Sequence, residues 1–133
     1  MKRVNQTKFG RPDGNCFEAC LASILELPLE AVPRYTGDDW LERINQWLRW
    51  HYSLQLIIAQ PDILDAGMAP DTYVIADGQN HQRVRHSVVH RGTTLVHDPN
   101  PSNGGLAITQ EVLVFVAINP ARMKRRKERA GTV

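Results

Sequence analysis

The first residue with evident chemistry is Cys16, which follows Gly14-Asn15 and begins a run rich in Ala and Leu. Ala, Leu and Glu favour a helix from Cys16 to Leu27, and Pro28 ends it. The first N–H groups of a helix have no intrahelical acceptor, and the helix dipole is positive at that end. A cysteine at this position is therefore favoured as a thiolate, the nucleophilic form of its side chain.

A nucleophilic thiol needs a base, and the base needs a group that orients it. His86 begins an apolar strand-like run, and Asp98 ends the next such run. A three-residue turn at 91–93 would place His86 opposite Asp98, whereas a two-residue turn at 91–92 would place it opposite His97. Turn chemistry does not choose between these registers. In the first, Asp98 shares the face of His86 and can accept a hydrogen bond that fixes the imidazole tautomer.

The elements that must position these residues are helical in the first half of the chain and strand-like in the second. A second helix begins at Asp38-Asp39, where two acids suit the positive end of its dipole. Helices followed by neighbouring strands indicate an α+β fold with an antiparallel sheet of four or five strands. The expected strands are 54–59, 73–76, 86–91, 93–98 and 112–118.

Four short stretches lie in order within residues 4–118: Gln6, the segment 14–23, His86-Ser87-Val88-Val89, and Val96-His97-Asp98-Pro99. With His before a Val-Val strand and Asp before Pro, this order resembles the papain-like cysteine peptidases. It is most similar to their compact bacteriocin-leader-processing (double-glycine) peptidase domains. The resemblance implies a papain-like fold in which N-terminal helices pack on a small antiparallel sheet.

The resemblance also implies a role for each matching residue. Cys16 would be the nucleophile, His86 the general base and acid, and Asp98 the group that orients the imidazole. Gln6 would form the oxyanion hole together with the backbone N–H of Cys16. Gln6 lies ten positions before Cys16, further than the family usually places it, so the intervening residues must loop out. Asn15 is the alternative side-chain donor.

The implied activity is hydrolysis of a peptide or isopeptide bond through an acyl-thioester on Cys16. The same triad could serve an amidase, a deamidase or an acyl-transfer enzyme, because fold and triad do not fix the acyl group. A non-catalytic binding or inhibitor protein on the same scaffold is a further alternative, and an unreactive Cys16 would mark it. We expect a peptide or protein substrate, specificity supplied by loops or by a protein partner, and no cofactor.

Composition and charge limit the remaining classes. The chain has 133 residues, 42% of them hydrophobic and 23% charged, which suits one small globular domain. We expect this domain at residues 1–119 and a flexible basic tail at 120–133. Nucleic acid is not an expected partner except weakly through the tail, because the rest of the chain is mildly acidic. The sequence has neither a membrane-length apolar run nor a secretory signal, so we expect a cytoplasmic protein without membrane contact.

Metal binding is the alternative to a thiol triad. Cys16 and Cys20 are four positions apart, as are His86 and His90, and both spacings occur in zinc fingers. The long separation between the pairs and the strand position of both histidines argue against a Cys2His2 site, so we expect no metal. Cys20 has apolar neighbours and is expected to be a small buried side chain. Neither cysteine is expected to form a disulfide.

Overall fold

The computed structural model describes residues 1–10, 12–68 and 71–118. The chain forms two compact units, each described by itself below. The first unit comprises Met1–Pro33 and Ile58–Val114, and the second comprises Arg34–Ile57 and Phe115–Val133. The basic tail expected at 120–133 lies outside the described residues.

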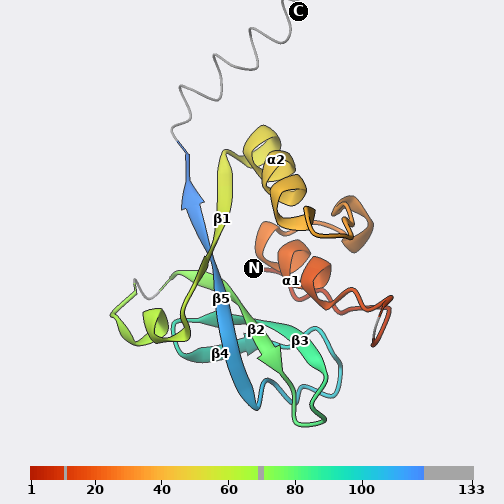
Figure 1. Ribbon diagram of the computed structural model, residues 1–133, viewed down its shortest axis with the longest axis vertical. Coiled ribbons are helices and arrows are strands. Elements are labelled where there is room, and N and C mark those ends of the chain that lie inside the picture. Colours follow the sequence, from red (N-terminus) through yellow and green to blue (C-terminus); the bar gives the residue numbers. More distant parts are fainter. Residues whose placement is uncertain (11, 69–70, 119–133) are drawn as a thin grey trace, which may run out of the picture. The chain divides into compact units, whose positions relative to one another are not determined.

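The strands form one five-stranded sheet in the order β1-β5-β2-β3-β4. They are β1 (Leu54–Ala59), β2 (Tyr73–Gln79), β3 (Arg85–Arg91), β4 (Thr94–His97) and β5 (Ile108–Ala117) (Figure 1). β2 pairs antiparallel with both β5 and β3, and β3 pairs antiparallel with β4. Residues 74–78 of β2 are all buried, as expected for a strand with neighbours on both sides and both faces covered.

Two α-helices, α1 (Cys16–Leu25) and α2 (Trp40–Tyr52), and two short 3-10 helices, η1 (Leu29–Ala31) and η2 (Pro61–Asp65), complete the described elements. Each α-helix ends at a left-handed residue, Glu26 after α1 and Ser53 after α2, whose N–H closes the last turn. The prediction of a mixed helical and antiparallel-sheet fold, α+β, is therefore confirmed at that level. In the described part of the chain no helix is long and apolar enough to cross a bilayer.

In the first unit, α1 packs on β2 and β3. Residues 19–22 of α1 are fully buried, and the alanines at both ends of this run allow close approach to the sheet. The strands contribute the fully buried side chains Val74, Ile75, Val88, Val89, Val112 and Leu113. Each such aliphatic side chain contributes roughly 1.5–3 kcal/mol by burial. This core fixes the first turn of α1, and with it Cys16, relative to β3.

In the second unit, one buried amide joins α2 to β1. Asn45 Nδ2 donates to the carbonyl oxygen of Leu56 at 3.0 Å, and Asn45 Oδ1 accepts the Leu56 N–H at 2.8 Å. The side chain thus satisfies both backbone groups of one strand residue, as a neighbouring strand would. Ile44, Leu48 and Leu56 are buried apolar side chains of the same two elements.

The β3–β4 hairpin has neither of the two registers expected from the sequence. Arg91 pairs with Thr94, which leaves residues 92–93 as the turn. The glycine at the first turn position has a φ of 60°, the positive value that tight hairpins require there. A bulge then shifts the register, so that Val89 pairs with His97. Both expected turns, 91–93 and 91–92, begin one residue too early.

The extents of β2 and β5 also differ from the sequence expectation. β2 continues beyond Ala76 to Gln79, and β5 begins at Ile108 instead of residue 112. Asp77 and Gly78 have low strand propensity, but pairing with strands on both sides outweighs that preference. The extension matters for the site, because Gly78 is the residue paired with His86.

Candidate active site

His86 and Asp98 meet through a short hydrogen bond. The Nε2–H group of His86 donates to Asp98 Oδ1 at 2.6 Å, and the two side chains are only 6% and 2% exposed. The bulge in the hairpin makes this contact possible. Without the one-residue shift, Asp98 would follow the register of Ser87 and lie on the opposite face of the sheet.

The Asp98 carboxylate is held by three donors. Oδ1 accepts from His86 and also from the backbone N–H of Asn100 at 2.9 Å, and Oδ2 accepts from the backbone N–H of Gly105 at 2.8 Å. Burial alone raises the pKa of this carboxyl, but the hydrogen bonds from His86, Asn100 and Gly105 outweigh it and lower the pKa below 3.8. The carboxylate is therefore ionised and fixed in orientation at neutral pH.

The side chain of Cys16 lies near the His86 ring. Nε2 of the ring is bound to Asp98, and Cys16 is close enough to raise the pKa of His86. Burial lowers the pKa of His86, but its hydrogen bond to Asp98 and the nearby Cys16 side chain, together with the charges of both, raise it to about 9. Cys16 is the first residue of α1 and is partly exposed. The predicted Cys16, His86 and Asp98 are thus adjacent in the structure.

Gly78 lies across the β2–β3 ladder from His86. A Cβ atom at this position would lie only 1.8 Å from the carbonyl oxygen of Ile108 in β5. The close approach occurs where the β2–β5 register shifts, between Asp77 and Gly78. A glycine inside a strand can mark such an approach, but the sequence alone does not identify the partner strand.

Gln6 is buried next to the segment that carries Asp98. Its backbone N–H donates to the carbonyl oxygen of Pro99 at 2.9 Å. Its side-chain Nε2 donates to the carbonyl oxygen of Lys8 at 2.9 Å, and the backbone N–H of Asn15 donates to the same oxygen at 3.2 Å. Among the described residues Gln6 Oε1 is buried without a hydrogen-bond partner. The Gln6 amide therefore lies close to the residue that precedes Cys16.

Asn15, considered above as the alternative side-chain donor, forms hydrogen bonds to the loop after Gln6. It occupies the N-cap position of α1, but its side chain makes no capping hydrogen bond. Instead, Oδ1 accepts the backbone N–H groups of Thr7 and Lys8, each at 3.0 Å, and Nδ2 donates to Thr7 Oγ1 at 3.0 Å. Asn15 thus holds the loop after Gln6 against the start of the helix. No local sequence pattern predicts this clamp, because its partners lie seven and eight positions away.

The loop before α1 turns tightly at Gly14. A Cβ atom there would lie 2.7 Å from the carbonyl oxygen of Gly10, which the N–H of Gly14 contacts at 2.6 Å. The glycine is therefore required by a tight loop. Cys20 is fully buried as expected, and burial, followed by the charge of Cys16, raises the pKa of its thiol.

The arrangement considered for a metal does not form. Within residues 1–10, 12–68 and 71–118, no three side chains of His, Cys, Asp or Glu are grouped as metal ligands would be. Cys20 lies in the core, and burial lowers the pKa of His90. Cys16 is instead near enough to His86 to raise the pKa of that imidazole.

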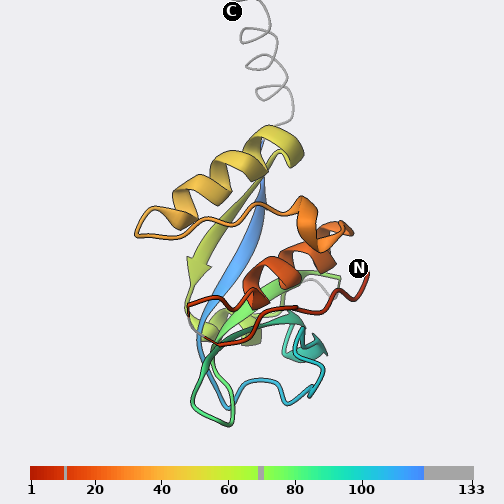
Figure 2. The same cartoon turned by 90° about the vertical axis from the view of Figure 1, so that its right-hand side faces the viewer.

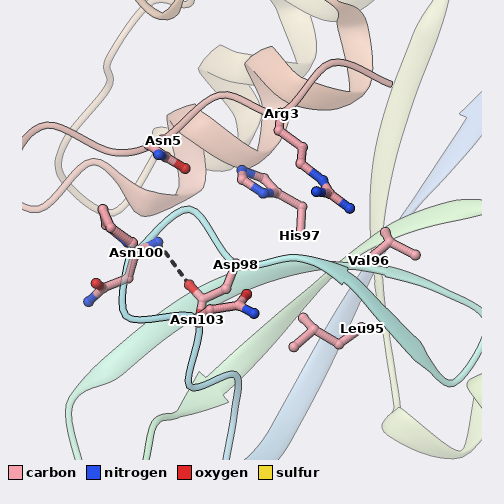
Figure 3. Close-up of a pocket in the computed structure, with 9 residues that line it drawn as sticks. Arg3, Asn5, Leu95, Val96, His97, Asp98, Asn100 and Asn103 are labelled. Atoms are coloured by element: carbon pink, nitrogen blue, oxygen red, sulfur yellow. Dashed lines mark hydrogen bonds between the residues drawn. The ribbon is translucent and has the colours of Figure 1, made fainter.

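A surface hollow of about 440 Å³ lies beside Asp98 (Figure 3). Neither Cys16 nor His86 lines it. The N-terminal segment forms one wall with Arg3 and Asn5, and β4 and the loop after Asp98 form the others. Figure 2 shows this N-terminal segment running alongside α1, where Lys2 N donates to the carbonyl oxygen of Ser23 at 3.1 Å.

No family model matches the sequence, and neither a curated protein nor a solved structure is detectably similar to it. Functional conclusions therefore depend on the described side chains. Among these, the imidazole and carboxylate predicted from the sequence are hydrogen-bonded, and the predicted thiol lies near enough to raise the pKa of the imidazole. Sequence reasoning missed the backbone donors of Asn100 and Gly105 to Asp98, although an Asp followed by Pro and Asn is typical of a turn in which the carboxylate accepts a nearby N–H.

Proposed function

We propose that this chain is a papain-like thiol hydrolase that cleaves a peptide or isopeptide bond through nucleophilic attack by Cys16. The supporting observation is the position of His86, which is hydrogen-bonded to Asp98 through Nε2 and lies near enough to Cys16 for that side chain to raise its pKa. A thiol next to an imidazole that a third group orients is the arrangement of an activated nucleophile. Cys20, which is sealed in the core, has no such partner in the described residues.

The first half of the proposed reaction acylates the enzyme. A pKa of about 9 keeps His86 protonated at neutral pH. Cys16 reacts as the thiolate, the form that the positive end of a helix favours, and Cys16 is the first residue of α1. The sulfur attacks the carbonyl carbon, a C–S bond forms, and the carbonyl π electrons move to oxygen. When the oxyanion collapses, the C–N bond breaks and His86 gives its proton to the leaving amine. The products of this half are an amine and an acyl-thioester on Cys16.

The second half releases the acyl group. His86 is now neutral and can accept a proton from a water molecule as that water attacks the thioester carbonyl. Collapse of the second oxyanion breaks the C–S bond and regenerates the thiolate beside the imidazolium. Asp98 keeps its negative charge throughout and stabilises the protonated ring, because three donors hold its pKa low.

The oxyanion formed in both halves needs hydrogen-bond donors. We assign this role to the backbone N–H of Cys16 and to the side-chain amide of Gln6, which donates one N–H to Lys8 beside the start of α1. Loss of one such donor typically lowers the rate by about 100- to 1000-fold. Both cysteines are free thiols, which suits a reducing compartment, and we propose the cytoplasm.

The test combines labelling with turnover. Iodoacetamide should label Cys16 much faster than Cys20, and mass spectrometry of the digested protein distinguishes the two sites. p-Nitrophenyl acetate should acylate Cys16, and a fluorogenic peptide library read by mass spectrometry should identify the bond that is broken. Cys16→Ala should abolish all three signals, whereas the matched Cys20→Ala variant should retain them. Equal labelling of both cysteines, or acylation that persists in Cys16→Ala, would contradict the proposal.

A further inference from the structure

One wall of the hollow beside Asp98 is the N-terminal segment, which is hydrogen-bonded to the rest of the first unit. The carbonyl oxygen of Val4 accepts the Nε2–H group of His97 at 2.7 Å, and Gln6 is buried. Arg3 and Asn5, the residues on either side of Val4, line the hollow (Figure 3). Both are exposed, so their polar ends are accessible to a ligand.

The hollow carries one positive charge and no accessible negative charge. Arg3 makes no ion pair within the part of the chain that the structure describes. Asp98 is the acid that lines the hollow, but its side chain is only 2% exposed. Both of its oxygens already accept hydrogen bonds, from His86, Asn100 and Gly105. An uncompensated cation at the wall of a concave surface favours an anion there.

The remaining lining residues indicate what kind of anion would fit. Asn5, Asn100 and Asn103 bring carboxamide groups to the hollow, and carboxamide N–H groups can donate to a carboxylate. Leu95, which is 37% exposed, and Pro101 add apolar surface. A volume of about 440 Å³ is within the usual range for a site that binds a small ligand.

We infer that this hollow binds a carboxylate of the substrate peptide, with the adjoining aliphatic part against Leu95. The carboxylate could belong to an acidic side chain or to a free C-terminus, since both offer the same two acceptor oxygens. The identity of this ligand as a substrate rests on the proposed function, whereas its binding in the hollow does not require Cys16. Asp98 lines the hollow and also orients His86, so the bound group lies next to the triad.

The test uses ¹⁵N-labelled Cys16→Ala protein, which cannot turn over a substrate. It is titrated with N-acetyl-leucine, with the neutral N-acetyl-leucinamide, and with N-acetyl-glutamic acid α-amide, whose only carboxylate is on its side chain. We expect the side-chain amide signals of Asn5 and Asn103 to shift with a carboxylate ligand and not with the neutral one. Arg3→Gln should weaken binding about fivefold, the upper range for an exposed ion pair. Lys2→Gln removes a neighbouring charge that does not line the hollow and should leave the affinity unchanged.

The outcomes separate the alternatives. Shifts with N-acetyl-leucine alone identify a free C-terminus, and shifts with the glutamic acid derivative alone identify an acidic side chain. Equal shifts with N-acetyl-leucinamide, no shifts at all, or equal weakening by Arg3→Gln and Lys2→Gln would overturn the inference. Acylation of wild-type Cys16 by p-nitrophenyl acetate is measured in parallel. Its failure would overturn the hydrolase proposal and leave the binding result standing.

Discussion

Ser87 donates its hydroxyl hydrogen to the buried carboxylate of Asp77, which lies directly opposite it across the β2–β3 ladder. On the other side of β2, Asp77 pairs with Glu111 of β5, and Glu111 forms an ion pair with Arg85 at 3.2 Å. Burial, and then the negative charge of Glu111, raise the pKa of Asp77 to about 6, although Ser87 and Arg85 act in the opposite direction. An acid that resists ionisation therefore lies in the strand next to the one that carries His86.

This pair predicts a pH-dependent stability. Because the folded-state pKa of Asp77 exceeds 3.8, folding favours the protonated acid, and that stability is lost as the pH rises from 3.8 to about 6. Asp77→Asn keeps an acceptor for Ser87 without the charge. Denaturant unfolding should find the variant more stable than wild type at pH 7, by up to about 3 kcal/mol, and less so at pH 4.5. Exposed Asp62→Asn is the control, and a gain in Asp77→Asn that does not change with pH would refute this origin.

The Asp98 contact predicts the titration of His86. In wild-type protein, NMR titration of His86 should give a midpoint near pH 9, and the ion-pair stability should be lost as the pH rises through that value. Asp98→Asn removes the carboxylate charge and should lower the midpoint, because Asp98 is the largest contributor that raises this pKa. Turnover should fall by about 100- to 10,000-fold. An unchanged midpoint would mean that Asp98 does not set the protonation state of the base.

The hydrogen bonds of Asn15 predict that replacing this residue slows the acylation of Cys16 and leaves its alkylation unchanged. Asn15→Ala removes three hydrogen bonds that hold Thr7 and Lys8. The loss should destabilise the protein by about 2–4 kcal/mol in denaturant unfolding. Acylation of Cys16 by p-nitrophenyl acetate should slow, because the loop that positions Gln6 is released, whereas iodoacetamide forms no oxyanion and should react at the wild-type rate. Asn15→Asp keeps the Oδ1 acceptor and should restore most of the stability, and equal slowing of both reactions would argue against a role through Gln6.

The close approach at Gly78 predicts that adding a single methyl group there strongly destabilises the protein. Gly78→Ala would place Cβ 1.8 Å from the Ile108 carbonyl oxygen, so β5 must move away from β2 opposite His86. We expect more than about 3 kcal/mol of destabilisation in thermal or denaturant unfolding. Gly104→Ala is the matched control, since a Cβ atom added there would have no neighbour within 4 Å, and it should stay within about 0.5 kcal/mol of wild type. Similar stability of the two variants would contradict the close approach.

Part of this arrangement could be predicted from the sequence because it depends on local patterns. The bounds of β1 and the starts of both α-helices follow from apolar runs, acids and proline, and the structure has them there or within two residues. The shared face of His86 and Asp98 was also predicted, but from a hairpin register that the structure does not have. The turn lies at 92–93, and a bulge between Val89 and His90 shifts the pairing by one further residue. The two differences from the expected register offset each other, so the side chains of His86 and Asp98 still lie on the same face.

The rest could not be predicted, because its partners are distant in the sequence. Asp77 is buried between strands that lie on either side of it, and only the sheet order identifies Glu111 as its neighbour. The role of Gly78 likewise depends on which strand passes beside it. Propensity describes single segments, whereas these contacts depend on how strands are ordered and paired.

The loop from Asn100 to Gly105 is closed by the same carboxylate that holds the imidazole. One oxygen of Asp98 accepts the Gly105 N–H, and the other is shared between Asn100 and His86. A displacement of this loop would therefore change the hydrogen bonds of Asp98, the group that contributes most to raising the pKa of His86. The protonation of the imidazole is linked in this way to the conformation of the loop that follows β4.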